Sequence, residues 1–144
     1  MPRDIWFRER DMQSERDIAL VTGVKRQDAC LLANGAMLPE LKEMGCQVHT
    51  ATKGADLTRL VRDGQLYDRI FVGFAEDLGE ATLKKLIKLN AGLICFMVNA
   101  ADPVDLTRYL SNVKPWSESW TWRTNRGTVV ATTARGDVDR DWIA

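Results

Sequence analysis

Two adjacent carboxylates, Glu76 and Asp77, are the side chains of this sequence best placed for acid–base chemistry. They follow an apolar run that ends in Gly73-Phe74-Ala75. A carboxyl group works as a general acid or base when burial or a neighbouring group perturbs its pKa. Acidic residues at the start of a helix need no such partner, because they stabilise the positive end of the helix dipole. We therefore interpret Glu76 and Asp77 first as helix-start residues and second as acid–base groups.

The chain holds one histidine, His49, and three cysteines that are far apart in the sequence. We interpret His49 as a hydrogen-bonded polar group near a strand end rather than as a base. Cys30, Cys46 and Cys95 lie in apolar contexts without a C-x-x-C pair, which favours small buried residues in a reducing cytosol. The sequence offers too few ligands for a structural zinc site. Because no Ser-His-Asp, Cys-His or P-loop pattern is present either, we expect no metal and no catalytic residues.

Tryptophan and basic residues gather near the C-terminal end of the chain. The predicted partner-binding residues are Trp116, Trp120, Trp122, Arg123 and Arg126. Tryptophan and arginine are enriched in binding hot spots, and the same mixture suits stacking on single-stranded nucleic acid. The 20 basic and 20 acidic residues cancel, which disfavours nucleic acid. Packing on the chain's own sheet is the first interpretation, and contact with another protein or a second copy of the chain is the next.

The stretch from Tyr67 to Val98 predicts a strand, a helix and a second strand. Ile70–Phe74 and Leu93–Val98 are continuous apolar runs, which are typical of buried parallel strands. Between these runs, one helical stripe is formed by Leu83, Leu86 and Ile87. Asp77 is expected to cap this helix, with Glu80 completing a capping box, and Asn90-Ala91-Gly92 is expected to form a left-handed exit. Two strands joined by a crossover helix should be parallel.

The segments before this unit are predicted with one alternative left open. Ile18–Val21 is predicted as the first strand, which ends at Thr22-Gly23. For residues 28–44 we favour a helix that breaks near Asn34-Gly35 and restarts at Pro39. The alternative makes Ala29–Ala33 a strand and Asn34-Gly35 its turn. Gln47–Ala51 is predicted as a strand.

Three further features complete the predicted fold. Asp56 can cap a short helix, and Asp102-Pro103 is a strong helix start. Residues 118–134 alternate like a hairpin, with Asn125-Arg126-Gly127 as a three-residue loop. If Thr124 opposes Thr128, then Trp122 opposes Val130 and Trp120 opposes Thr132. The fold class is therefore α/β, a Rossmann-like, mostly parallel sheet flanked by helices with a C-terminal antiparallel hairpin. We expect an arm at 1–16, one domain at 17–135 and a tail at 136–144.

Four segments resemble parts of one enzyme family: GAMLPELKEMGCQV, YDRIFVGF, AGLICFMV and WTWRTNRGTVVATTAR. Over residues 17–135 their arrangement resembles the class I S-adenosylmethionine-dependent methyltransferase fold, with one strand–helix unit fewer after the second strand. The resemblance implies a glycine-rich turn after the first strand that holds the amino-acid part of the cofactor. It also implies an acid at the end of the second strand that holds the ribose hydroxyls.

The chain departs from the family at both of these positions. The first turn reads Thr22-Gly23-Val24-Lys25 or Leu32-Ala33-Asn34-Gly35, and the second strand ends in His49-Thr50-Ala51-Thr52-Lys53 without an acid. If a cofactor binds at the carboxyl ends of the strands, the predicted contacts are Gly23, Lys25, His49, Thr52, Phe74, Glu76 and Asp77.

Our first hypothesis is therefore a non-catalytic, methyltransferase-like binding module with a degenerate cofactor site and no cofactor, acting through protein–protein contacts. The alternative is an active small methyltransferase that holds S-adenosylmethionine by a divergent loop. No stretch approaches the ~18 apolar residues of a membrane span, and the start of the chain is too charged for a signal peptide. We expect a soluble cytoplasmic protein.

Overall fold

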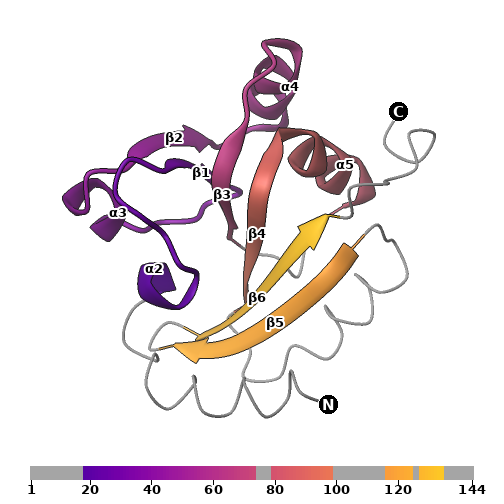
Figure 1. Cartoon of the computed structure of the whole chain (residues 1–144). Helices are drawn as coiled ribbons and strands as arrows, with labels where there is room; N and C mark the ends of the chain where they lie inside the picture. Colours follow the sequence, from indigo (N-terminus) through magenta and orange to yellow (C-terminus); the bar gives the residue numbers. More distant parts are fainter. Residues whose placement is uncertain (1–17, 74–78, 99–115, 125–126, 135–144) are drawn as a thin grey trace.

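The computed structural model describes residues 18–73, 79–98, 116–124 and 127–134 (Figure 1). The elements along the chain are α2 (Ile18–Val21), β1 (Ala29–Ala33), α3 (Glu40–Glu43), β2 (Gln47–Ala51), α4 (Gly54–Arg62), β3 (Tyr67–Val72), α5 (Glu80–Leu89), β4 (Asn90–Val98), β5 (Trp116–Thr124) and β6 (Gly127–Ala134). The predicted arm, the tail and the helix start at Asp102-Pro103 lie outside the described residues.

The strands form one sheet in the order β2-β1-β3-β4-β6-β5. Strands β2, β1, β3 and β4 are parallel, whereas β6 runs antiparallel to β4 and pairs with β5 as a hairpin. The predicted fold class is confirmed: a mostly parallel sheet that ends in an antiparallel hairpin. No helix in the described residues is long and apolar enough to cross a bilayer.

Helices cover both faces of this sheet, and the helices on one face are longer than those on the other. Figure 1 shows α4 and α5 on one side of the sheet and α2 and α3 on the other. The α4/α5 side holds a buried cluster that includes Leu57, Leu83, Leu86, Ile70 and Ile94. The α2/α3 side holds a second buried cluster that includes Ile18, Leu41, Phe71, Cys95 and Val129. The apolar strand residues therefore alternate between two cores, as expected for a sheet buried on both faces.

The central strand–helix–strand unit is confirmed, but both of its predicted helix ends are wrong. Helix α5 begins at Glu80 with Gly79 at the N-cap position, and Asn90 passes directly into β4 with φ −87° and ψ 123°. No left-handed exit is formed at Gly92. Glycine is needed there because a Cβ atom would collide with the backbone oxygen of Asp68 on the neighbouring strand.

The predicted first strand, Ile18–Val21, is a single turn of helix. The hydroxyl of Thr22 donates to the oxygens of Ile18 and Ala19, at 2.9 and 3.2 Å, which closes the turn. Gly23 then takes φ 71°, a left-handed conformation that suits a helix end. Short apolar runs do not distinguish a strand from a buried helix turn, so this prediction was wrong for lack of a periodic signal.

The first strand is instead Ala29–Ala33, the alternative for residues 28–44. The favoured helix over this segment is wrong. Asn34 and Gly35 end the strand with φ values of 54° and 85°, both left-handed. Asparagine and glycine tolerate this conformation. Here they end a strand, whereas the favoured prediction made them a break within a helix.

The C-terminal hairpin is confirmed with a register one residue tighter than predicted. Thr124 pairs with Gly127, so positions 125 and 126 alone separate the two strands, and the three-residue loop is wrong. Consequently Trp122 pairs with Val129 and Trp120 with Ala131. Gly127 is therefore the first residue of β6 and not part of the turn.

The environments of the cysteines lead to a labelling prediction. Cys30 and Cys95 are fully buried and Cys46 is half-buried. Burial, with a smaller contribution from Cys46, raises the pKa of the Cys30 thiol to about 12, and burial also raises the pKa of Cys95. At pH 8 the Cys30 thiolate fraction is then roughly 10⁻⁴.

We expect Ellman's reagent at pH 8 to label Cys46 rapidly in the native protein, and Cys30 and Cys95 only as the chain unfolds. The variant Cys46→Ser should lack the fast phase, and the denatured wild-type protein should release three equivalents. Fast labelling of Cys30 or Cys95 in the native state would contradict the packing described above.

Candidate functional site

Two of the predicted cofactor residues, Gly23 and Lys25, lie at the amino ends of the parallel strands and not at the carboxyl ends where they were predicted. They precede β1 and so lie near its amino end, because the first strand starts at Ala29 and not at Ile18. There the Gly23 oxygen accepts a 3.3 Å hydrogen bond from Nη2 of Arg69, and the Lys25 amide donates to Asp28 Oδ2 at 2.8 Å. These contacts stabilise the turn that leads into β1.

His49 lies within β2, where it pairs with Leu31, and not beyond the strand end. Its Nδ1 atom shares a 2.8 Å hydrogen bond with the hydroxyl of Tyr67, and the two rings meet edge to face with centroids 5.6 Å apart. Burial raises the pKa of Tyr67, so the hydroxyl stays protonated at neutral pH. This partner supports the interpretation of His49 as a hydrogen-bonded polar group.

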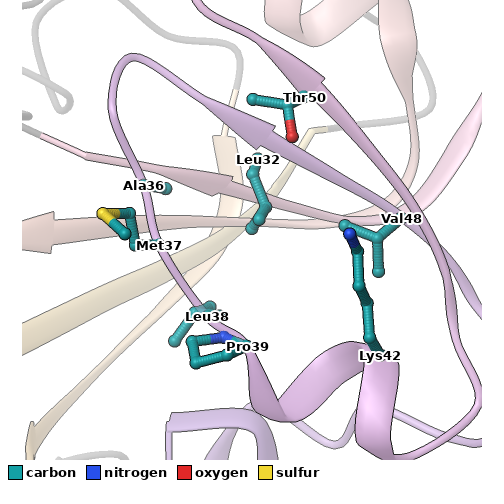
Figure 2. Close-up of a pocket in the computed structure, with 8 residues that line it drawn as sticks. All are labelled: Leu32, Ala36, Met37, Leu38, Pro39, Lys42, Val48 and Thr50. Atoms are coloured by element: carbon teal, nitrogen blue, oxygen red, sulfur yellow. The ribbon is translucent and has the colours of Figure 1, made fainter.

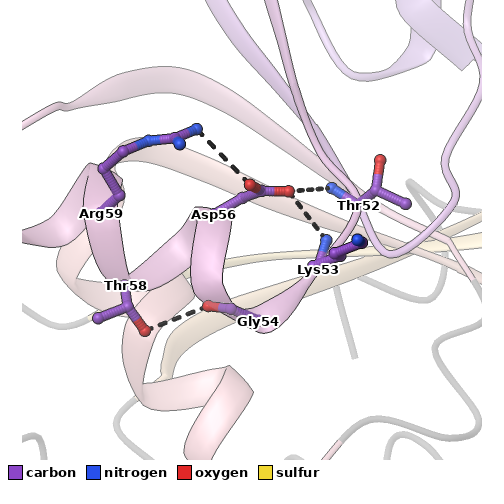
Figure 3. Close-up of polar contacts among 6 residues, drawn as sticks. All are labelled: Thr52, Lys53, Gly54, Asp56, Thr58 and Arg59. Atoms are coloured by element: carbon purple, nitrogen blue, oxygen red, sulfur yellow. Dashed lines mark hydrogen bonds and ion pairs between the residues drawn. The ribbon is translucent and has the colours of Figure 1, made fainter.

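Thr52 does lie at the carboxyl end of β2, where its backbone binds an acid from the chain itself. The Asp56 Oδ2 atom accepts hydrogen bonds from the amides of Thr52 and Lys53, at 3.1 and 3.0 Å (Figure 3). Arg59 Nη2 lies 3.5 Å from the other carboxylate oxygen. The hydrogen bond from the Lys53 amide has the largest effect on the pKa of Asp56, and together with that from Thr52 it holds this pKa below its usual value. Asp56 therefore stabilises the start of α4, although from inside the helix and not from the predicted cap position.

The remaining predicted site residues are only partly placed by the structure. Phe74, Glu76 and Asp77 lie outside the described residues. Trp116, Trp120, Trp122 and Arg123 belong to β5, and Arg126 lies outside the described residues. Their roles in binding a cofactor or a partner stay predictions.

The point where the strand order reverses lies between β1 and β3, which is where open α/β sheets usually bind ligands. Here the two strand ends are bonded to each other. The Gly73 amide donates to the Ala33 oxygen at 2.9 Å, and Asn34 Nδ2 donates to the Gly73 oxygen at 2.7 Å.

The turn after β1 also lies directly on Gly73. A Cβ atom at position 73 would come within 2.7 Å of the Ala36 nitrogen and 2.9 Å of the Asn34 oxygen. The backbone of the turn after β1 therefore packs directly on the end of β3. The alternative interpretation of residues 28–44 made Asn34-Gly35 a turn after a strand, but nothing in the sequence links that turn to Gly73, 39 positions away from Asn34.

A pocket of about 340 Å³ lies nearby, on the α3 side of β1 and β2. It is lined by Leu32, Ala36, Met37, Leu38, Pro39, Lys42, Val48 and Thr50. Figure 2 shows the Lys42 side chain running beside Val48 and the Thr50 hydroxyl pointing toward Leu32. The pocket is thus apolar, with one ammonium and one hydroxyl group on its lining.

The pocket exists because helix α3 is a single turn. Pro39 lies at its N-cap and Met44 at its C-cap, so the helix covers only a small part of the face of β1 and β2. Met37, just before it, is 78% exposed on the rim. The pocket was not predicted from the sequence, because the favoured interpretation made Ala29–Ala33 part of a broken helix instead of a strand. The short interval between Pro39 and Gly45 was the available signal for a single-turn helix.

No protein-family model and no curated protein sequence matches the chain. Among solved structures it is similar to a proposed methyltransferase, SMU.776, complexed with S-adenosylhomocysteine (12% identity, TM-score 0.46, 80% of this chain). It is also similar to a proposed S-adenosylmethionine-dependent methyltransferase from Streptococcus mutans (13%, 0.45, 79% of this chain). A third is magnesium protoporphyrin IX methyltransferase (ChlM) from Synechocystis PCC 6803 with bound S-adenosylhomocysteine (10%, 0.37, 78% of this chain).

The chain spans about half the length of the first two of these structures, 47% and 46%, and 75% of the third. All three are described as methyltransferases, the class of fold that the sequence resembles. At these identities and TM-scores the similarity transfers no site residue to this chain. The functional argument therefore rests on the contacts of the chain itself.

Proposed function

We propose that this chain is a non-catalytic, methyltransferase-like binding module that acts through protein–protein contacts. The observation that carries the proposal is the close packing and hydrogen bonding of the Asn34–Ala36 turn on Gly73, at the strand-order reversal where a ligand-binding crevice would open. A nucleoside cofactor bound there needs the backbone of the first turn to approach it and offer free N–H groups.

The groups that would offer this grip have other roles in the described residues. The Gly73 amide already donates to Ala33, and the Ala36 amide donates to the same oxygen at 3.2 Å. The acid nearest the end of β2, Asp56, is bonded to the amides of Thr52 and Lys53. Two large apolar side chains are exposed in the described residues, Met37 at 78% and Leu66 at 58%, but single exposed apolar side chains are common on monomers. The protein-contact half of the proposal therefore rests on the predicted partner-binding residues Trp116, Trp120, Trp122 and Arg123.

The test is calorimetry of the purified protein with S-adenosylmethionine and S-adenosylhomocysteine. We expect no 1:1 binding at concentrations up to about 1 mM, equivalent to a binding free energy weaker than about −4 kcal/mol. Clear 1:1 binding at micromolar strength would overturn the proposal. It would favour the alternative, an active small methyltransferase that holds S-adenosylmethionine through a divergent loop.

A matched variant tests whether the closed crevice is the cause. Asn34→Gly removes the side-chain bond to Gly73 while keeping a residue that tolerates the φ of 54°. Gly54→Ala, where a Cβ atom would meet nothing within 4 Å, serves as the control. Weak cofactor binding by Asn34→Gly alone would support closure as the block.

The protein-contact half of the proposal is tested by sedimentation and by the partner-binding tryptophans. Trp120→Ala and Trp122→Ala should leave the thermal unfolding transition in place and abolish a self-association or a defined protein complex. Loss of folding in both variants would instead support packing of the tryptophans on their own sheet.

A further inference from the structure

We propose that the pocket beside α3 binds a small amphipathic carboxylate, with an alkyl or aryl body on the apolar lining and its anionic group at Lys42. The pocket lies on the face of β1 and β2 and not in the crevice between β1 and β3. This inference therefore does not depend on the proposed function.

The size and lining of the pocket indicate an apolar body. Its volume of about 340 Å³ is at the lower end of the roughly 300–1,000 Å³ that ligand pockets occupy. Leu32, Ala36 and Leu38 line it and are 8%, 5% and 2% exposed, so their side chains are well fixed by the core around them. Such a lining is preformed and loses little free energy by ordering when a ligand enters.

The two polar groups indicate the charge of the ligand. Within the described residues, neither the Lys42 ammonium nor the Thr50 hydroxyl has an ion-pair or hydrogen-bond partner. Both line the pocket, from α3 and from the edge strand β2 respectively. An ammonium and a hydroxyl can both donate to one carboxylate, and a charge-assisted hydrogen bond is stronger than a neutral one. Among the residues that the structure describes, no carboxylate lines the pocket to compete for Lys42.

The first experiment is an NMR titration of the full chain with octanoate, hexanoate, octanol and octylammonium. We expect octanoate to bind with a dissociation constant on the order of 0.1–1 mM and to shift the resonances of Leu32, Ala36 and Val48. Each buried methylene contributes about fourfold in affinity, so hexanoate, with two methylenes fewer, should bind roughly fifteenfold more weakly. Octanol should bind about fivefold more weakly than octanoate, and octylammonium weaker still.

Variants identify the site. Lys42→Met keeps the apolar stem but removes the charge, so octanoate should lose about fivefold while octanol is unchanged. The control is Lys88→Met, an exposed lysine of α5 on the other side of the sheet. Thr50→Trp should fill the pocket from an exposed strand position, where tryptophan is well tolerated, and abolish binding of both ligands.

Three outcomes overturn the inference. They are no binding of octanoate up to about 10 mM, equal affinity for octanoate and octylammonium, or unchanged octanoate binding in Thr50→Trp. Each can occur with or without binding of S-adenosylhomocysteine, so failure here is distinguishable from failure of the proposed function.

Discussion

Replacing Phe71 by alanine is expected to lower the free energy of unfolding by about 3–5 kcal/mol. Phe71 is 0% exposed at the centre of β3, where it pairs with Leu32 on one side and Cys95 on the other. It belongs to the cluster that joins α2 and α3 to the sheet. Two short helices cannot collapse far into the space left by a phenyl ring, so most of the cavity should remain.

Urea denaturation measures this loss as a lower midpoint with an unchanged slope. Since domains of this kind have about 5–15 kcal/mol in total, a sizeable part of the stability is removed by one substitution. The control is Leu66→Ala, an apolar residue that is 58% exposed and should change stability by no more than about 0.5 kcal/mol. A loss below about 1 kcal/mol for Phe71→Ala would mean that the α2/α3 side of the sheet is loosely packed.

The elements that were predicted correctly have clear hydrophobic patterns over residues close together in the sequence. The apolar runs at Ile70–Phe74 and Leu93–Val98 flank Leu83, Leu86 and Ile87, which share one helix face. The central unit could therefore be identified from residues close together in the sequence. The same is true of the alternating hairpin at 118–134. Its register was missed by one residue because Gly127 suits both a turn and a strand end.

The parts that failed depend on contacts between distant residues. Ile18–Val21 has the composition of a strand, yet it ends as a helix turn whose Thr22 and Gly23 oxygens accept from Arg69, 47 and 46 positions away. The wrong first strand then moved Gly23 and Lys25 to the carboxyl edge of the predicted sheet. The pocket beside α3 was missed for a related reason, because the favoured interpretation made Ala29–Ala33 helical and so left no strand there whose face could line a pocket.

Gly73→Ala is expected to destabilise the protein by about 1–3 kcal/mol and to displace the turn after β1. The added Cβ atom would lie 2.7 Å from the Ala36 nitrogen and 2.9 Å from both the Asn34 oxygen and the Gly35 carbonyl carbon. All three are backbone atoms, so no side-chain rotation relieves the contact. The turn must move away, which weakens the 2.7 Å hydrogen bond from Asn34 to the Gly73 oxygen.

Gly54→Ala is the matched control, because a Cβ atom there meets nothing within 4 Å and the residue begins helix α4. Alanine at such a position should be neutral or stabilising by several tenths of a kcal/mol. Amide chemical shifts of residues 34–36 should change in Gly73→Ala and stay constant in Gly54→Ala.

The Gly73→Ala variant also distinguishes two causes of the absence of cofactor binding that we propose. If closure by the turn were the whole barrier, moving the turn should raise the affinity for S-adenosylhomocysteine. If the binding groups themselves are lost, the affinity should stay unmeasurable although the turn has moved. Equal stability of Gly73→Ala and wild type, with unchanged shifts at 34–36, would instead show that the turn does not rest on β3, and the argument from closure would fall.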